Sequence, residues 1–425
     1  MRYKILAFIG FLQLPHVATS QELWSLQEAE QLFLNQNIEI QEGKAELYVA
    51  ESAIQQAKLF NNPELTLEQV NLWSTQSQRD GESTVIPPVI GSVGKNTQFS
   101  IGIEQEIRLG GKRKKGVQLA RLNHRLTSLK QAYSSEEALL HFRSLLFEKD
   151  YYKAYQLTLR EELDLLHQVS QTYEKQRELG FISTSDLLRI QAAEYEVEQE
   201  YMETNQAWSQ LNELIHSLLG RSITEQIEID YSSIRFELPD ILEQHELHHP
   251  LLQMGQEEIQ LKRKSLALEK AQKIPDIRLS GNYDRHGGVW PNFIGFGIRF
   301  TLPIWNRNQG NIKAAQTLLD LEQSKLDAQR IALQNKIHTE LNTYNQLVAF
   351  REKITQDFTD ESLKQIQQSY LKNLLQKNIS LIEFLDFTDT YKERQKILLE
   401  TDRKLHTQYF TLRYTLGHKT THYEN

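Results

Sequence analysis

The chain has 425 residues, no cysteine and a formal net charge of −8. Without cysteine, no disulfide framework supports the fold and no lipidated cysteine anchors it, so stability has to come from packing and assembly. The acidic balance argues against nucleic acid as a main partner.

The start of the chain has the composition of a secretory signal peptide. Arg2 and Lys4 make it basic, and residues 5–14 form an apolar run that is too short to span a bilayer. Small residues then precede Gln21. We therefore predict cleavage before Gln21, which makes 1–20 a signal peptide and places the mature chain outside the cytoplasm.

The rest of the sequence repeats one unit. Ile182 and Ile379, like Gly220 and Gly417, occupy matching positions and are 197 residues apart. Each copy has the order helix, β-hairpin, long helical hairpin, which indicates a duplication. The predicted organisation is a first repeat at 21–220, an inter-repeat linker at 221–236, a second repeat at 237–417 and a C-terminal tail at 418–425.

Each copy opens with a segment of helical composition. Residues 22–60 are rich in Glu, Gln, Ala and Leu and end before Pro63, and residues 238–273 end in the same way before Pro275. Proline cannot continue a helix, so one helix is predicted in each segment.

Alternating apolar and polar residues follow each proline and predict amphipathic strands. Ile277 and Leu279, for example, alternate with Arg278 and Ser280. One face would meet lipid and the other a wet lumen; the alternative is a soluble β-sandwich with its apolar face inward. The predicted strands lie at about 64–73, 98–109, 276–285 and 292–304.

Two long tracts, 113–179 and 309–377, are almost free of glycine and proline and predict long helices. The first would be about 100 Å long at ~1.5 Å per residue. Each tract ends at a short turn and is followed by a second helix that runs back along it, which gives helical hairpins at 113–219 and 309–416. Ser185 and Ser380 are the predicted N-caps of the returning helices, with Glu383 completing a capping box.

Four amphipathic strands cannot close a barrel, and an open sheet edge is not tolerated in lipid. The chain is therefore expected to oligomerise, as a dimer with about eight strands or a trimer with about twelve. The sequence alone does not decide between the dimer and the trimer. A conduit needs the wider barrel, so a duct function favours the trimer.

Residues 106–113 and 302–310 both lie where a strand turns into a long helix. These stretches resemble the CzcC-like heavy-metal branch of the TolC-like outer-membrane efflux family, and the duplicated order resembles that family over nearly the whole mature chain. Some relatives in the branch carry a lipidated cysteine, which this chain lacks, so anchoring would rest on the barrel.

The resemblance implies a mainly α fold with a membrane β-barrel contribution. Four strands per chain would form a shared 12-stranded barrel in the outer membrane of a Gram-negative bacterium, continued by a periplasmic α-helical tunnel. The homotrimer would work with a periplasmic adaptor and an inner-membrane RND transporter. It would be a passive exit duct of a tripartite pump, needing no cofactor, for heavy-metal cations such as cobalt, zinc, cadmium or copper.

Several groups of residues are candidates for function. The strand-to-helix turns contain Gly110, Gly111, Arg113, Asn306, Arg307 and Gly310. The helical hairpin tips, where an adaptor would dock, contain Gly180, Phe181, Ile182, Ser183, Asn378, Ile379 and Ser380. Glu383, Asp386 and Asp389 recur every three residues and form either an acidic gate or a solvated helix face. His245, His248 and His249 are weak metal candidates.

Two other classes of function fit the sequence less well. An enzyme is not indicated, because the sequence has no phosphate-binding glycine loop, nucleophile elbow or His-Glu-x-x-His motif. A periplasmic coiled-coil adaptor would also have long helical hairpins, but it needs no lipid-facing strands. The same duct fold could instead serve drug export or protein secretion.

Overall fold

The computed structural model describes residues 22–68, 98–222, 227–231, 249–286, 290–356 and 360–417. The chain forms two compact units, each containing parts of both sequence repeats. The first unit is drawn from residues 1–41, 134–245 and 334–425, and the second from residues 42–133 and 246–333. Helices α4 (Lys112–Glu178) and α7 (Gln309–Gln356) contribute to both units.

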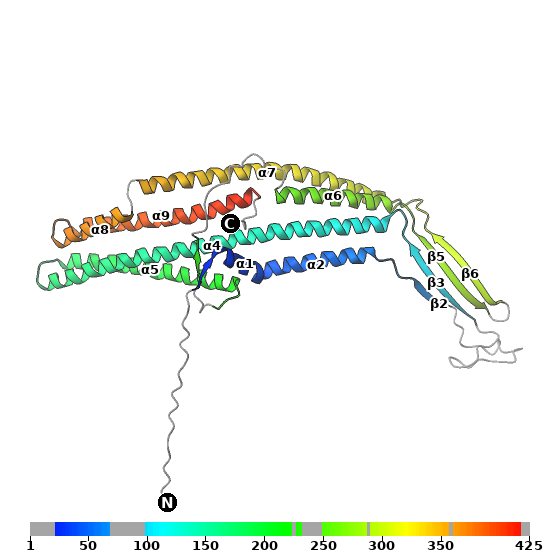
Figure 1. Ribbon diagram of the computed structural model, residues 1–425, viewed down its shortest axis with the longest axis horizontal. Helices are drawn as coiled ribbons and strands as arrows, with labels where there is room; N and C mark the ends of the chain where they lie inside the picture. Colours follow the sequence, from blue (N-terminus) through cyan, green and yellow to red (C-terminus); the bar gives the residue numbers. More distant parts are fainter. Residues whose placement is uncertain are drawn as a thin grey trace, which may run out of the picture. The chain divides into compact units, whose positions relative to one another are not determined.

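The second unit contains a four-stranded antiparallel sheet (Figure 1). Its order is β2-β3-β5-β6, so the two hairpins of the repeats pair through β3 and β5, with Ile103 opposite Gly281. The remaining elements are α6, most of α2 and the N-terminal parts of α4 and α7. The bounds are α2 (Ile38–Lys58), β2 (Glu64–Glu68), β3 (Gln98–Ile107), α6 (Pro250–Ala271), β5 (Ile277–His286) and β6 (Trp290–Phe300).

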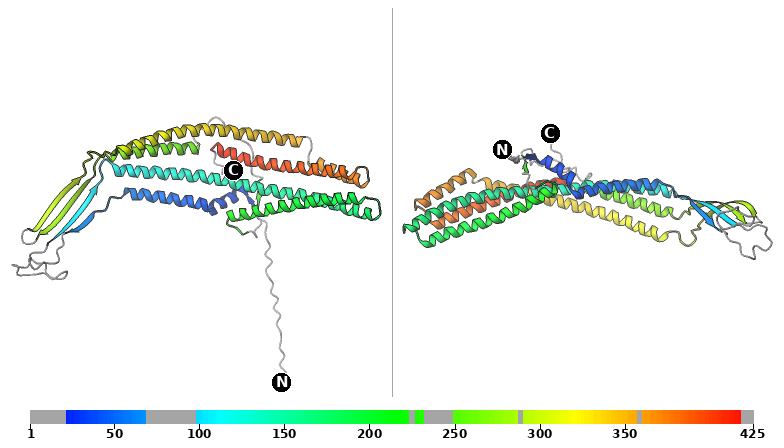
Figure 2. Two further views of the ribbon diagram at one scale, coloured as in Figure 1. Left: turned by 180° about the vertical axis from the view of Figure 1, so that it is seen from behind. Right: turned by 90° about the horizontal axis from the view of Figure 1, so that it is seen from below.

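The first unit consists mainly of helices that run side by side (Figure 2). They bury two apolar cores, one around Phe142 and Phe410 and one around Leu159 and Phe384. No helix within the described ranges is long and apolar enough to cross a membrane. The bounds are β1 (Glu22–Ser25), α1 (Leu26–Gln36), α5 (Thr184–Leu218), β4 (Ile227–Asp230), α8 (Asp360–Leu375) and α9 (Leu381–Thr415).

The duplication is visible in the backbone. Left-handed residues occur in three pairs, each 197 residues apart: Gly111 and Asn308 (φ 68° and 59°), Gly180 and Lys377 (76° and 63°), Gly220 and Gly417 (62° and 77°). The first pair turns a strand into a long helix, and the other two end helices. Because this conformation is unfavourable for residues with a Cβ, its recurrence shows that both copies use the same turns.

The expectation of one helix over 22–60 is wrong in detail. The segment begins with β1, which pairs in parallel with β4, so that Trp24 lies opposite Ile229. After Ser25 caps α1, the helix stops at Asn37, whose backbone is extended. The Asn37 side chain then accepts a hydrogen bond from the Ile40 amide at 3.2 Å, which starts α2.

Three smaller expectations also change. Ser183, not Ser185, caps α5, because its hydroxyl accepts from the Asp186 amide at 3.1 Å. The last strand ends at Phe300 instead of continuing to residue 304, before Pro303, which has no amide to donate. The tract expected at 309–377 is described as α7 and α8, with residues 357–359 outside the described part. Ser380 and Glu383 form the predicted capping box.

The turn at Gly180 gives a first testable prediction. A Cβ at Gly180 would meet no atom within 4 Å, so Gly180→Ala should cost only the conformational strain at φ 76°. We expect a loss of about 1 kcal/mol in the free energy of unfolding. The matched control is Gly116→Ala inside α4, where there is also open space, and it should stabilise by up to about 1 kcal/mol. Thermal melts followed by circular dichroism would compare them; equal effects would contradict the account.

Candidate functional site

The two faces of the four-stranded sheet have opposite chemistry. One face is apolar and exposed: Phe296 is 90 % exposed, Ile298 70 % and Leu65 69 %. The other carries mainly polar and charged side chains and glycines, with Phe293 of β6 as an aromatic exception. An exposed apolar face of this size is unfavourable in water and favourable against lipid. The polar-face residues are Glu64, Thr66, Glu68, Ser100, Gly102, Glu104, Glu106, Arg278, Ser280, Asn282, Asp284, Gly295, Gly297 and Arg299.

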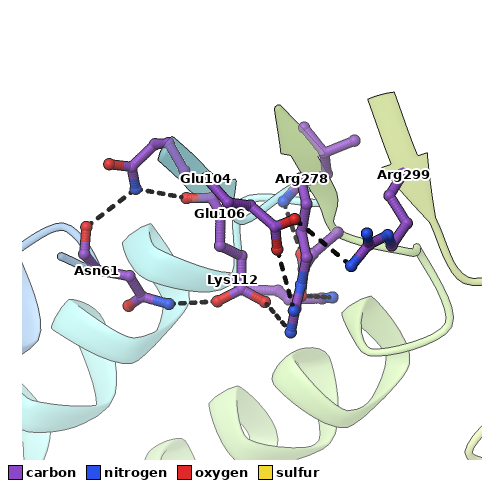
Figure 3. Close-up of polar contacts among 9 residues, drawn as sticks. Asn61, Glu104, Glu106, Lys112, Arg278 and Arg299 are labelled. Carbon is purple, nitrogen blue, oxygen red and sulfur yellow. Dashed lines mark hydrogen bonds and ion pairs between the residues drawn. The ribbon is translucent and has the colours of Figure 1, made fainter. Parts of the chain in front are cut away.

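Charges of opposite sign are paired on the polar face (Figure 3). Glu104 bridges two strands, because it contacts Arg278 at 3.2 Å and Arg299 at 3.5 Å. Glu106 lies 3.9 Å from Arg278 and also accepts a hydrogen bond from Asn61, which precedes β2. This network links β3, β5 and β6 at the end of the sheet where the helices begin.

The strand-to-helix turn before α4 is held by a partly buried ion pair. Lys112 is 7 % exposed, contacts the Asp276 carboxylate at 2.9 Å and donates to the Ile274 carbonyl at 2.7 Å. Asp276 in turn accepts from the Leu109 amide at 2.9 Å. The start of α4 is thereby fixed to the start of β5.

The predicted turn residues fall into different roles. Gly110 and Gly111 have φ of 67° and 68°. Arg113 stacks over the Phe60 ring at 3.8 Å. In the second copy the Asn306 side chain accepts from the Asn308 amide at 3.0 Å. The Arg307 guanidinium donates to the Ile304 carbonyl at 3.2 Å, and Gly310 lies in the first turn of α7 with open space around it.

The two hairpin tips are built alike. The Phe181 amide donates to the Gln176 carbonyl at 2.8 Å, and the Asn378 amide donates to the Asn373 carbonyl at 2.8 Å. Phe181 is 67 % exposed, and the Lys377 ammonium lies 5.6 Å from its ring centroid. Ile182 and Ile379 instead pack against the apolar core of this end of the unit. The tips are therefore ordered turns, and the first carries an exposed aromatic residue.

The three acids that follow the second tip do not act alike. The pKa of Glu383 lies below its usual range, because the Ser380 amide and hydroxyl donate to its carboxylate at 2.8 Å and 2.9 Å. The Asp389 side chain is 76 % exposed and contacts Lys392 at 3.2 Å. Asp386 is exposed. Glu383 is thus a capping residue, and a gate role for Glu383, Asp386 and Asp389 stays a prediction.

The histidine cluster is described only in part. His245 and His248 lie outside the described residues. His249 is 3 % exposed and caps α6, accepting from the Leu251 amide through Nδ1 at 3.1 Å. In the described part of the chain, no group of three or more His, Asp or Glu side chains is arranged to hold a metal ion.

Some residues that shape these sites were not predicted from the sequence. Asn308 and Lys377 carry the left-handed turns of the second copy, and the constant offset from Gly111 and Gly180 would have located both. Glu162 is a buried acid, 5 % exposed, within the first unit. Its signal was an acid at three-four spacing between Leu159 and Leu166 in an otherwise apolar stripe.

The sheet and the long helices together define a class of protein. The sheet has a lipid-compatible face and a polar, charge-paired face, and it continues into helices as long as the 67 residues of α4, about 100 Å. Such a combination is typical of an outer-membrane channel that extends as a helical conduit.

Comparisons with known proteins agree with this class. The family described as outer membrane efflux protein matches residues 30–221. The cobalt-zinc-cadmium resistance protein CzcC of Cupriavidus metallidurans is 24 % identical over 336 residues, which cover 77 % of this chain and 73 % of CzcC. The family model thus matches the first repeat, and most of the chain is similar to CzcC.

Solved structures share the fold. The channel-forming protein CusC has a TM-score of 0.76 and 16 % identity, with 93 % of this chain and 92 % of CusC covered. The outer membrane protein VceC of Vibrio cholerae has a TM-score of 0.72 and 15 % identity, with 92 % and 96 % covered. The predicted fold class, a duplicated unit with four strands and long helical hairpins, is therefore confirmed.

Proposed function

We propose that the protein is the passive exit duct of a tripartite RND-type pump and works as a homotrimer. The observation that carries the proposal is the four-stranded sheet, which has one exposed apolar face, one polar face and two outer edges. In lipid, such edges have to be paired, and three copies supply the twelve strands of a barrel wide enough for a lumen. The periplasmic part would be the helical tunnel.

Edge pairing between copies is directly testable. Within the described residues, β2 pairs only with β3 and β6 pairs only with β5. We expect β2 of one copy to pair with β6 of the next, so Leu67→Cys combined with Ile298→Cys should form a disulfide-linked oligomer. Neighbouring pairs such as Leu65 with Phe296 would scan the register.

The natural chain has no cysteine, so the cross-linking background is zero. Denaturing gels without reductant are expected to show a ladder up to three chains for at least one pair. The two single-cysteine variants serve as controls and should give no trimer. If no pair in the scan produces more than monomer, the closed barrel is wrong.

A second feature supports assembly of copies. On α5, Leu188, Tyr195 and Met202 lie seven residues apart and are 61 %, 66 % and 59 % exposed. An apolar stripe with this spacing fits another helix in a coiled-coil arrangement. We assign it to a helix of the neighbouring copy, which would bury it in the helical tunnel.

The hairpin tips are proposed to dock the periplasmic adaptor. The support is the exposed Phe181 ring beside Lys377, at the end of a long helical hairpin. An exposed aromatic residue next to a cation suits a contact with another protein. Phe181→Ala should weaken cross-linking to the adaptor and leave the trimer intact.

Asp386 and Asp389 are proposed to place acidic rings near the narrow end of the trimer. Rings of carboxylates favour cations in a pore. Single-channel recordings in a salt gradient should therefore show a smaller cation preference for Asp386→Asn combined with Asp389→Asn. A preference equal to that of the wild type would mean that these acids form a solvated outer face.

We propose heavy-metal cations as the substrate, because the chain is similar to a cobalt-zinc-cadmium resistance protein. The test is deletion of this chain in a strain that keeps its adaptor and transporter. Tolerance to cobalt, zinc, cadmium or copper should fall and should return with the gene. Lost tolerance to drugs with unchanged metal tolerance would instead support a drug duct, and lost protein secretion would support a secretion duct.

A further inference from the structure

The junction between the sheet and the helices of the second unit is strongly basic. Four segments make this junction: 56–63, 108–115, 270–276 and 303–313. They contain ten basic residues and one acid, Asp276, whereas the whole chain has a net charge of −8. We call these four segments the basic band. The ten residues are Lys58, Arg108, Lys112, Arg113, Lys114, Lys115, Lys270, Lys273, Arg307 and Lys313.

Intramolecular pairing does not account for most of this charge. Asp276 forms an ion pair with Lys112. The polar-face acids Glu104 and Glu106 form ion pairs with arginines of the strands. Seven exposed members of the basic band form no ion pair with any residue that the structure describes. They are Lys58, Arg108, Lys114, Lys270, Lys273, Arg307 and Lys313.

Exposed aromatic side chains lie in the same band. Trp305 is 86 % exposed, and Phe60 is 74 % exposed with the Arg113 guanidinium 3.8 Å from its ring centroid. Phe60 precedes β2 and Trp305 follows β6, and both strands belong to the sheet whose apolar face is exposed. Aromatic rings beside basic residues at the limit of an apolar surface are typical of the level of lipid headgroups.

We propose that the basic band binds anionic phospholipid headgroups of the membrane leaflet that borders the helices. The charge is complementary to phosphodiester groups, and the exposed apolar sheet face places acyl chains next to it. Long lysine side chains can reach headgroups from the end of a strand. The protein would then select anionic over zwitterionic lipid. The inference rests on the proposed insertion of the sheet in a membrane.

The test uses the full-length protein reconstituted in phosphatidylcholine vesicles. Spin-labelled phosphatidylglycerol and spin-labelled phosphatidylcholine are added separately, and electron spin resonance gives the motionally restricted fraction of each. The band variant is Lys114→Gln, Lys273→Gln and Lys313→Gln. The control variant removes three exposed charges of the first unit that form no ion pair with the described residues: Arg160→Gln, Lys175→Gln and Lys353→Gln.

For the wild type and the control variant, we expect phosphatidylglycerol to be preferred severalfold at low salt, and the preference to fall at high salt. For the band variant the ratio should approach one. Equal association of the two lipids with the wild type, or an unchanged preference in the band variant, would overturn the proposal.

Gel mobility with and without heating separates this inference from the proposed function. If the wild type neither inserts nor forms a heat-sensitive trimer, the proposed function fails. If only the band variant loses the trimer, the basic band is a contact between copies and the lipid proposal is wrong. A trimer that is retained together with lost lipid preference supports the proposal.

Discussion

Replacing Glu30 by alanine is expected to destabilise the first unit by about 3 to 5 kcal/mol, because it leaves a buried arginine without its carboxylate. Glu30 on α1 contacts Arg143 on α4 at 2.5 Å, and the two side chains are 3 % and 0 % exposed. The Arg143 guanidinium also lies 4.6 Å from the centre of the Phe410 ring on α9. The pair thus connects three elements of one core.

The matched control removes both charges together. Glu30→Leu combined with Arg143→Met keeps the volume and removes both charges of the pair, so most of the loss should be recovered. Thermal melts of the detergent-extracted protein, followed by helical circular dichroism, would measure both. A Glu30→Ala variant as stable as the wild type would contradict the account, and so would a double variant that loses more than the single one.

The stability of the first unit is expected to depend on pH through Glu162. This carboxyl on α4 is 5 % exposed, and burial raises its pKa to about 7. Lys392 on α9 lowers the pKa and opposes the shift, whereas Asp389 on α9 and Glu200 on α5 raise it further. Lys396 and Tyr155 contact Glu200 at 2.8 Å and 2.7 Å and complete the surrounding polar groups.

The sign follows from proton linkage. The folded state holds the Glu162 proton more tightly than the unfolded chain does, so the stabilising contribution is complete below about pH 4.5 and is lost as the pH rises through about 7. A shift of this size corresponds to at most about 3 kcal/mol. We therefore expect the free energy of unfolding to fall between pH 5 and pH 8.

Glu162→Gln should flatten this dependence and stabilise the protein at pH 8. The neighbouring residue provides a control, since Glu161 is 55 % exposed and pairs with Lys364 at 3.0 Å on the surface. Glu161→Gln should change stability by less than about 1 kcal/mol and leave the pH slope unchanged. Thermal melts at pH 5, 6, 7 and 8 would test this prediction. If stability changed with pH in the same way for the wild type and Glu162→Gln, Glu162 would not be the cause of the pH dependence.

The architecture could be predicted because its signals are periodic and long. The 197-residue offset, the alternation around Ile277 and the long tract after Arg113 each involve many residues, so local exceptions do not obscure them. Within the described residues, the four strands of the sheet and the long helices occur in the predicted order along the chain.

The errors come from features decided by a few atoms or by distant partners. The strand at residues 22–25 forms because it pairs with residues 227–230, some 200 positions away. No local sequence pattern indicates such a pairing. Asn37 interrupts a segment of good helix formers through one side-chain hydrogen bond.

The candidate sites were predicted less completely than the fold. The capping role of Glu383 was predicted and is confirmed, whereas its part in an acidic gate stays a prediction. The Glu30–Arg143 pair and Glu162 were not predicted, because burial of a charge depends on packing across several helices. Their sequence signal was weak: a charged residue within a buried apolar stripe, as at Arg143 beside Phe142.

The trimeric duct is tested most directly by isolating outer membranes from cells that produce the tagged protein and comparing its gel mobility with and without heating. We expect a species in the outer membrane that migrates as a trimer when unheated and as a single chain after boiling. A soluble periplasmic monomer, with the same mobility in both samples, would contradict it and favour an adaptor-like rod.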